Sequence, residues 1–346
     1  MVAVERTTLP IVDVAGSHRE IGRGIGEALR DGLLGVAEAH WAGVEATIGW
    51  QRAIEIAALL VPFAEATLPH CVEELRGMAE GSDVPFETLF SMNALQETRF
   101  LAGRDAASPA PDDDDGCTSL AASGAATANG HVLLAHNEDA GTIRQAFPYV
   151  VRARPTGRPA FVGFAYSGLL LYQGLNERGI GSVGNALYMR DIRPGTPKLF
   201  AYRDVLDATF LEDAIRRTHK PTRANGNNHL IANQDGEIYD IEVSGGDVAL
   251  IPADDDTLAH TNHVIGPRLR DLEWGDLLNS RMRLTRVERL LARQRGSLTV
   301  ESLFDILSDH SNYPKSVCKH PDPVLNPDTM TVSSVVIDLT AGQLHV

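Results

Sequence analysis

The chain has 346 residues and an apolar fraction of 43%, which is enough to bury a sizeable core in one large domain or two smaller ones. Its formal net charge is -15, with 46 acidic and 31 basic residues, and this argues against nucleic acid as a partner because phosphate binding needs a basic surface. Small molecules are the expected partners. No apolar run reaches the roughly 18 residues of a membrane helix. The three scattered cysteines favour a reducing cytoplasm over a disulfide framework.

The first hundred residues have mainly helical periodicity. Met1 to Pro10 lacks the apolar core of a signal peptide, so none is expected. Ile11 to Val14 alternates as a short strand, and Ser17-His18-Arg19-Glu20 is a capping box that predicts a helix to about Glu38. The helical spacing resumes from Gln51 to Glu97. Breaks are expected at Pro62, Pro69 and the Gly81-Ser82-Asp83 turn.

Three glycines in the first predicted helix, Gly22, Gly24 and Gly26, superficially resemble a nucleotide-binding fingerprint. Glu27 stands where the third glycine of that fingerprint belongs, and the glycines lie inside a helical pattern rather than in a strand-to-helix turn. Close helix packing is therefore the favoured interpretation.

The composition changes between residues 101 and 116, where glycine, serine and proline precede four aspartates, Asp112 to Asp115. The run resembles a calcium loop only in charge, because the ligand spacing of such a loop is missing. An exposed linker is the better interpretation, and loops of this kind are favoured sites of chain cleavage.

After this linker the pattern becomes mainly that of strands. Strands are expected at 117–122, 131–136, 149–154, 160–165, 180–185, 230–241 (a hairpin turning at Asp235-Gly236), 248–251, 332–339 and 343–346. Helices are expected at 198–207, 211–218, 277–294 and 302–308. Strands, then helices, then strands again predict an α+β fold in which helices cover antiparallel sheets.

Cys117 is the leading candidate for a nucleophile. A buried cysteine is usually a small apolar residue, but Cys117 follows Gly116 at the end of the acidic linker and opens a predicted strand. Cleavage between Gly116 and Cys117 would free an α-amino group with an ordinary pKa of about 7.7 to 8.0, which can accept the thiol proton. Such a site needs a carboxylate to orient the ammonium and donors for an oxyanion. Asp139 lies at the end of the next strand and can approach Cys117 across the Asn129-Gly130 hairpin.

The sequence carries a series of landmarks in a fixed order. They are Asp115-Gly116-Cys117-Thr118-Ser119, Asn137-Glu138-Asp139, Gly174-Leu175-Asn176 with Gly179-Ile180, Asn185-Ala186-Leu187, His260-Thr261-Asn262-His263 and Asn312-Tyr313-Pro314, preceded by Glu20-Ile21-Gly22 and Glu74-Leu75-Arg76-Gly77-Met78-Ala79. This series resembles that of the penicillin acyltransferase family (acyl-coenzyme A:6-aminopenicillanic acid acyltransferase) of N-terminal-nucleophile hydrolases, and it spans nearly the whole chain.

The resemblance implies an αββα sandwich and self-cleavage before Cys117. The helical α-chain would be 1–116, including the acidic linker 101–116, and the β-chain 117–346, and the two would stay together as one domain. By resemblance, Cys117 is the nucleophile, Asp139 holds its amine and Asn262 donates to the oxyanion. Secondary candidates are Arg283, Thr118 and Asn185.

The sequence departs from the family in two places: the first concerns the position of Asp139, and the second concerns the substrate. The hairpin between Cys117 and Asp139 is a few residues longer than in the fungal acyltransferase, and Glu138 stands where that enzyme has an aromatic residue. The second change argues against a direct transfer of penicillin chemistry to this chain.

Other polar residues were weighed as alternatives. His260 and His263 could be half of a zinc site, but no cysteine or acidic partner follows at helical spacing, so packing at a strand end is favoured. Arg281 and Arg283 compete for a place near the nucleophile. Cys71 and Cys318 are expected to be core thiols. No cofactor and no metal are expected.

The sequence thus favours an autoproteolytic amidase that cleaves a small linear N-acyl amine through an acyl-enzyme. An acyltransferase using an acyl thioester such as acyl-CoA shares the same intermediate and stays open. A second alternative is an uncleaved binding protein of the same fold. The expected partners are a small-molecule substrate and the associated α and β fragments, with a homo-oligomer left open.

Overall fold

The computed structural model describes residues 9–103, 116–141, 147–275, 277–325 and 329–346. Most of the predicted linker, with its aspartates Asp112 to Asp115, lies outside the described residues, as does most of the N-terminal stretch where no signal peptide was expected. No helix within the described ranges is long and apolar enough to cross a membrane.

The N-terminal half is helical, as predicted, after one short strand, β1 (Ile11–Gly16). Its helices are α1 (His18–Ala28), α2 (Arg30–Thr47), α3 (Trp50–Thr67), α4 (Pro69–Ser82), α5 (Phe86–Asn93) and α6 (Leu95–Gly103). The capping box at Ser17 is confirmed, because its side chain accepts from the backbone N–H of Glu20 while Glu20 accepts from the N–H of Ser17.

Two predicted boundaries in this half are wrong. The first helix ends at Ala28 instead of running to Glu38, since Leu29 leaves helical geometry before α2 begins. Pro62 does not interrupt α3. Leu60 and Ala64, on either side of it, are fully buried, so the packing of this face offsets the lost backbone hydrogen bond.

The glycines of α1 serve helix packing. A Cβ on Gly22 would lie 1.8 Å from the carbonyl oxygen of Glu74, and one on Gly26 would lie 2.4 Å from that of Met78. Both carbonyls belong to α4, so the backbones of α1 and α4 approach as closely as only glycine allows.

The strands form two sheets. The eight-stranded sheet has the order β1-β4-β5-β6-β7-β8-β9-β10, and the five-stranded sheet the order β11-β2-β3-β12-β13. The larger sheet adds β4 (Pro148–Pro155), β5 (Phe161–Tyr166), β6 (Gln173–Asn176), β7 (Ile180–Val183), β8 (Asn227–Asn233), β9 (Ile238–Val243) and β10 (Val248–Pro252). The smaller sheet consists of β2 (Cys117–Ala122), β3 (Leu133–Gly141), β11 (Thr257–His260), β12 (Thr329–Asp338) and β13 (Gln343–His345).

The pairing is antiparallel throughout both sheets except between β1 and β4, which run parallel. The purely antiparallel expectation is therefore wrong at this one edge. Strands β6 and β11, each four residues long, were not predicted either.

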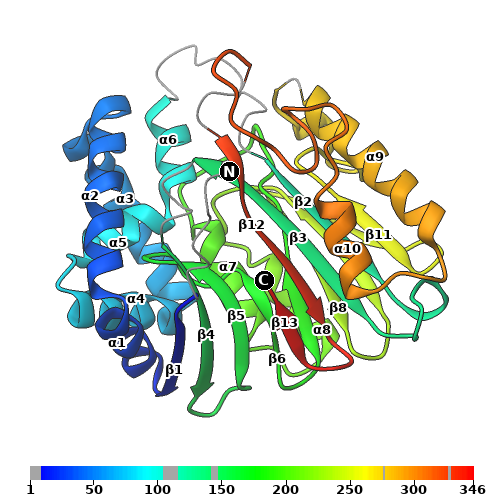
Figure 1. The fold of residues 1–346 in the computed structure, drawn as a ribbon. Coiled ribbons are helices and arrows are strands. Elements are labelled where there is room, and N and C mark those ends of the chain that lie inside the picture. The colour runs from blue at the N-terminus through cyan, green and yellow to red at the C-terminus, as the bar shows by residue number, and fades with distance from the viewer. Residues whose placement is uncertain (1–8, 104–115, 142–146, 276, 326–328) are drawn as a thin grey trace, which may run out of the picture.

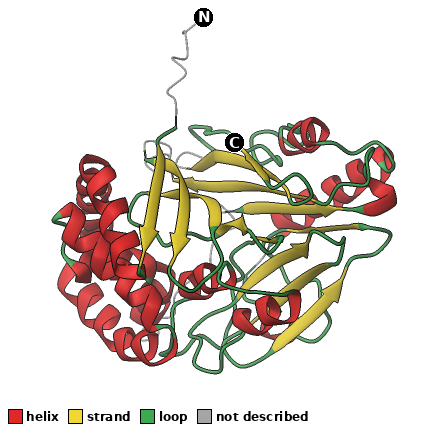
Figure 2. Cartoon of the chain, turned by 90° about the horizontal axis from the view of Figure 1, so that it is seen from below, coloured by secondary structure: helices red, strands yellow, loops and turns green. Residues whose placement is uncertain are grey.

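Helices cover the outer faces of the two sheets, and this confirms the α+β class with an αββα layering. Helices α9 (Leu278–Gln294) and α10 (Val300–Leu307) pack on the five-stranded sheet, while α8 (Leu211–Thr218) packs on β8 and β9 near α7 (Lys198–Val205). Apolar side chains such as Leu134, Leu230 and Ile337 fill the space between the sheets. Helices α1 to α6 gather at one side, next to β4 (Figure 1), and Figure 2 shows helices on both outer faces of the strands.

A buried ionic cluster joins the N-terminal helices to the second half of the chain. Arg203 of α7 is completely buried and donates to both oxygens of Glu74 of α4 and, at 2.8 Å, to Asp207. His18 at the start of α1 lies 3.1 Å from Glu74 and 3.5 Å from Asp207. The cluster thus connects α1 and α4, which precede residues 104–115 in the sequence, to α7, which follows them.

Candidate active site

The hairpin of β2 and β3 places Cys117 at the start of an inner strand of the five-stranded sheet. Cys117 is the first residue of β2, it is buried, and it pairs with Glu138 of β3 in the antiparallel register. Its thiol donates to Glu138 Oε2 at 3.5 Å. The neighbour that faces the sulfur is therefore Glu138, not Asp139.

Asp139 lies at the other end of the peptide bond that precedes Cys117. Its backbone N–H donates to the carbonyl oxygen of Gly116 at 2.7 Å. Its carboxylate accepts from the Thr331 hydroxyl at 2.6 Å through Oδ1. Among the described residues no group donates a hydrogen bond to Oδ2, although the buried Lys319 ammonium lies 4.0 Å away. Burial raises the pKa of Asp139, while Lys319 and Arg283 oppose this rise.

Gly116 occupies a position with no room for a side chain. A Cβ there would lie 2.8 Å from Arg283 Nη2, 3.0 Å from Lys319 Nζ and 3.1 Å from Asp139 Oδ2. Oδ2 of Asp139 therefore faces the Gly116 end of the Gly116–Cys117 bond, together with two cations.

Asn262, which follows β11, holds the nitrogen of the same bond. Its Oδ1 accepts from the backbone N–H of Cys117 at 2.9 Å, and its Nδ2 donates to the carbonyl oxygen of Ala186 at 3.2 Å. Ser280 of α9 accepts from the Asn262 N–H at 2.8 Å and so fixes this segment against the helix. The amide oxygen, rather than the amide nitrogen, faces Cys117 in this form of the chain.

Arg283, and not Arg281, points from α9 towards the nucleophile. Arg283 is buried, whereas Arg281 is exposed and pairs with Glu273. The Arg283 guanidinium donates to a set of neutral acceptors around Cys117. These are the Cys117 carbonyl oxygen at 2.6 Å, Thr118 Oγ1 at 2.9 Å, Asn262 Oδ1 at 2.8 Å and Asn279 Oδ1 at 3.0 Å.

The remaining secondary candidates lie in different places. Thr118 contacts Arg283 directly, as described above. Asn185 has none of these contacts with Arg283. Among the described residues, its side chain accepts a hydrogen bond from Ser119 at 3.0 Å and lies 3.3 Å from His260 Nδ1. The Ser119 hydroxyl in turn lies 2.9 Å from His136 Nδ1, and His136 Nε2 lies 3.3 Å from Glu138. A buried polar chain thus leads from Asn185 to the carboxylate beside the thiol.

The thiol is held in its protonated form. Burial raises the pKa of Cys117 well above its ordinary value, and the nearby carboxylates of Glu138 and Asp139 raise it further. Since the thiolate and not the thiol is the nucleophile, Cys117 needs a base in this form of the chain, in which its nitrogen is still bonded to Gly116.

The two histidines considered as half of a metal site have different partners in the structure. His260 lies 3.0 Å from Glu242 and 3.7 Å from Asp240, all fully buried, while His263 lies 2.8 Å from Ser280. Burial alone would lower the pKa of His260, but Asp240 and Glu242 raise it to about 9. The prediction of a core thiol is confirmed for Cys71 and wrong for Cys318, which is partly exposed.

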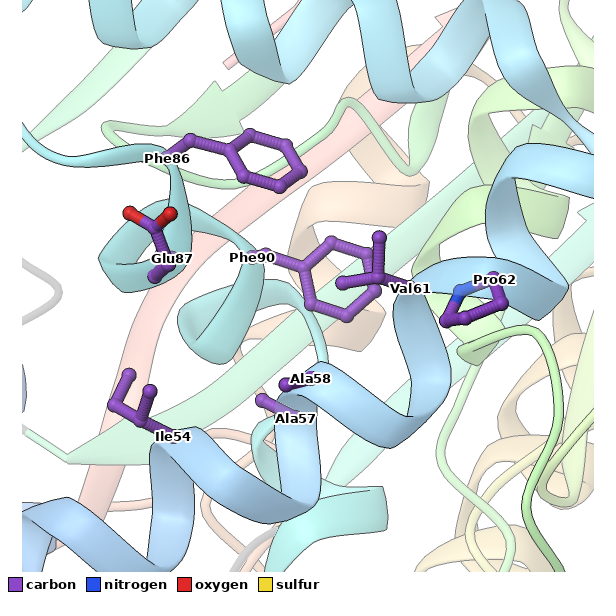
Figure 3. Close-up of a pocket in the computed structure, with 8 residues that line it drawn as sticks. All are labelled: Ile54, Ala57, Ala58, Val61, Pro62, Phe86, Glu87 and Phe90. Carbon is purple, nitrogen blue, oxygen red and sulfur yellow. The ribbon is translucent and has the colours of Figure 1, made fainter.

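The structure also contains an apolar pocket away from Cys117. It has a volume of about 270 Å³ and lies between α3 and α5, with Glu87 as its only charged lining residue among those described (Figure 3). Ala57, Val61 and Phe90 are among its apolar walls. The pocket belongs to the helical segment and includes none of the residues around the Gly116–Cys117 bond.

A cysteine opening an inner strand of a four-layer αββα sandwich is the arrangement of the N-terminal-nucleophile amidohydrolases and acyltransferases, the class of enzyme to which the chain conforms. The model of the acyl-coenzyme A:6-aminopenicillanic acid acyl-transferase family matches residues 126–344, and the chain belongs to this family. Cys117 precedes the matched range. A search of curated proteins finds no match.

Several solved enzyme structures are similar in outline. The N-acylethanolamine-hydrolyzing acid amidase ortholog of Caenorhabditis elegans is 17% identical, with a TM-score of 0.49 over 65% of this chain and 93% of that one. A mutant of the conjugated bile acid hydrolase of Clostridium perfringens is 13% identical, with a TM-score of 0.44 over 66% and 88%. Penicillin V acylase of Agrobacterium tumefaciens is 15% identical, with a TM-score of 0.44 over 64% and 80%.

Sequence reasoning missed two charged groups of the site. Glu138 was noted only as a departure from the family, although the alternation of β3 alone could have shown that it and Asp139 face opposite ways. Lys319 gave no signal, because it lies in an irregular segment far along the chain and reaches Asp139 only through the fold.

Proposed function

We propose that the chain cleaves itself between Gly116 and Cys117 and then acts as a cysteine amidohydrolase on a small linear N-acyl amine. One observation carries the proposal: both ends of the Gly116–Cys117 bond are held beside the thiol. The Gly116 carbonyl accepts from the Asp139 N–H, and the Cys117 N–H donates to Asn262. Hydrogen-bond donors aimed at a carbonyl oxygen stabilise the oxyanion that forms when the carbonyl carbon is attacked.

Self-cleavage begins with the thiol. Glu138 takes its proton, and the thiolate attacks the Gly116 carbonyl carbon while the oxyanion stays on the Asp139 N–H. The carbon–nitrogen bond then breaks as the proton passes to the Cys117 nitrogen, leaving a thioester. Water hydrolyses the thioester, so that the products are a carboxylate on Gly116 and a free amine on Cys117.

In the cleaved enzyme the new amine replaces Glu138 as the proton acceptor. Its ordinary pKa of about 7.7 to 8.0 suits this role near neutral pH. Asp139 Oδ2 accepts no hydrogen bond from the described residues in the uncleaved chain and faces the Gly116 end of the bond, which supports its assignment as the group that holds the ammonium.

Asn262 is assigned as an oxyanion donor for the substrate. Its Nδ2 donates to Ala186 in the uncleaved chain, so this role requires Nδ2 to exchange that carbonyl for the substrate oxygen. The tetrahedral intermediate then collapses: its carbon–nitrogen bond breaks, the Cys117 ammonium protonates the leaving amine, and the acyl-enzyme remains. Water hydrolyses the acyl-enzyme and frees the acid.

Acyl transfer is the second candidate, and the family to which the chain belongs favours it. The same acyl-enzyme would form from an acyl thioester and pass to an amine instead of water. Incubation with an acyl-CoA and an amine acceptor, followed by assay for free CoA and the new amide, separates transfer from hydrolysis.

The decisive experiment follows the intact mass of the purified chain over time. We expect two fragments, the second beginning at Cys117, and no cleavage in Cys117→Ala. A single full-length species in both proteins would favour the uncleaved binding protein. Once cleavage is established, Asn262→Ala should lower the rate of amide hydrolysis by about 100-fold or more, and a loss of only a few fold would refute its assigned role.

A further inference from the structure

We propose that His310, Cys318 and His320 bind one transition-metal ion, with zinc as the first candidate. The three residues lie in the irregular segment between α10 and β12, outside the site described above. Their ligand atoms all lie within 4.8 Å of one another.

Two of the three ligand–ligand distances can be compared with those around a shared ion. The two imidazoles bring their Nε2 atoms to 2.7 Å, and Cys318 Sγ lies 3.7 Å from His320 Nε2. A tetrahedral zinc with ordinary bond lengths places two nitrogens about 3.3 Å apart and a nitrogen and a sulfur about 3.6 Å apart. The nitrogen–sulfur distance already matches. The nitrogen–nitrogen distance needs a small opening, which the exposed His310 side chain can provide.

The chemistry of the ligands points in the same direction. A thiolate with two imidazoles is a donor set that selects zinc and related borderline ions, and it is unsuited to calcium or magnesium, which prefer oxygen. Three protein ligands leave one tetrahedral position for water. His310 is exposed and the other two residues are partly exposed, so an ion can reach them from solvent.

The backbone that carries the ligands is already fixed. The Cys318 N–H donates to the Asp309 carbonyl oxygen at 3.1 Å, the Lys319 N–H to Thr331 Oγ1 at 2.8 Å and the His320 N–H to the Pro314 carbonyl oxygen at 3.1 Å. An ion that binds here gains from this preorganisation, because little further ordering of the chain is needed.

The site would also touch the proposed active site through one residue. Lys319 lies between two of the ligands and turns the other way, to within 4.0 Å of Asp139 Oδ2. A metal bound by Cys318 and His320 would therefore hold the segment from which Lys319 approaches Asp139. We infer that the ion stabilises this cation's position and plays no part in the bond-breaking steps.

The test uses cobalt as an optical probe and zinc for affinity on the metal-free full chain. We expect one equivalent of Co²⁺ to give a thiolate-to-metal absorption band in the wild-type protein and in Cys117→Ala, and no such band in Cys318→Ser. His310→Ala, which alters an exposed side chain, should weaken zinc binding by about 100-fold in calorimetry. It should also reduce the rise in Tm that a given zinc concentration causes in the wild type.

Three outcomes would overturn the proposal. In the first, the cobalt band is lost in Cys117→Ala and retained in Cys318→Ser, which would place the ion on Cys117, His136 and Glu138 instead. In the second, zinc binds His310→Ala and the wild type equally well. In the third, no stoichiometric binding is seen at micromolar protein.

Discussion

The Cys117 thiol donates to Glu138 Oε2 at 3.5 Å, and both side chains are buried. In the proposed self-cleavage, this pair would supply a proton acceptor that the Cys117 nitrogen cannot provide while it is part of a peptide bond.

We therefore predict that Glu138→Gln slows self-cleavage by about 100-fold or more, the usual contribution of a positioned general base. The glutamine keeps the shape of the side chain and removes its basicity. The measurement is the time course of the intact mass of freshly purified precursor. Glu27→Gln, an exposed change on α1, is the matched control. Cleavage of Glu138→Gln at the wild-type rate would exclude Glu138 as the base.

Arg283 is the second position where charge and geometry can be separated. Arg283→Lys keeps the positive charge, but an ammonium cannot reach all four acceptors of the planar guanidinium. We expect cleavage and amide hydrolysis to slow by about 10- to 100-fold, because each hydrogen bond to a charged group contributes about 1.5 to 3 kcal/mol.

The control for this change is Arg289→Lys on the exposed side of the same helix, which should behave as wild type. If both variants turn over at the wild-type rate, the fork of hydrogen bonds around Cys117 has no catalytic role.

The buried cluster of Glu74, Arg203 and Asp207 leads to a prediction about stability. Arg203→Met leaves two carboxylates buried without their cation, so the free energy of unfolding should fall by about 3 to 5 kcal/mol in urea titrations. Arg19→Met removes a surface cation that pairs with Glu73 and Glu80, and it should lower the free energy of unfolding far less, because exposed ion pairs contribute little to stability.

The same pair of variants tests fragment association. After cleavage, the fragments of the Arg19 variant should elute together in size-exclusion chromatography, whereas those of the Arg203 variant should separate at lower denaturant concentrations. Equal stability of the two variants would show that the cluster does not hold the halves together.

The buried group of His260, Asp240 and Glu242 predicts a dependence of stability on pH. The pKa of His260 is raised to about 9, above its ordinary value of about 6.5. Its contribution to stability is therefore fully present below about pH 6.5 and is lost as the pH rises through 9. Burial also raises the pKa of Asp240 to about 6. The ionisation of Asp240 therefore lowers the stability of the fold as the pH rises from about 4 to 6, which is again a loss of stability with rising pH.

In the wild type, the free energy of unfolding from urea titrations should fall by an amount on the order of 2 to 3 kcal/mol between pH 6.5 and 9. We expect His260→Gln to flatten this pH dependence. His345→Gln, near the end of the chain, should retain the wild-type slope. A slope that is unchanged in the His260 variant would mean that this histidine is neutral in the folded protein.

Much of the architecture could be predicted because it follows local patterns. The strand at 117–122, the helix at 211–218 and the capping box at Ser17 were predicted as the structure has them. Boundaries set by packing were harder, and the continuation of α3 through Pro62 depends on contacts made by other elements.

The residues of the site were also predicted only in part. The structure brings Cys117, Asp139, Asn262 and Arg283 together, although their chemical roles stay predictions. The register of β2 against β3 could not be obtained from the sequence, because a shift of one residue exchanges Glu138 for Asp139 opposite Cys117. The approach of Lys319 depends on the path of an irregular segment, which no periodic pattern encodes.

The parallel pairing of β1 with β4 has a consequence for the proposed cleaved enzyme. Strand β1 is the outermost strand of the larger sheet and belongs to the N-terminal fragment, whereas every other strand of that sheet comes from the C-terminal one. Loss of the N-terminal fragment would expose the unpaired N–H and C=O groups of β4 to other copies of the protein. By staying bound after cleavage, the N-terminal fragment would therefore prevent aggregation through this sheet edge.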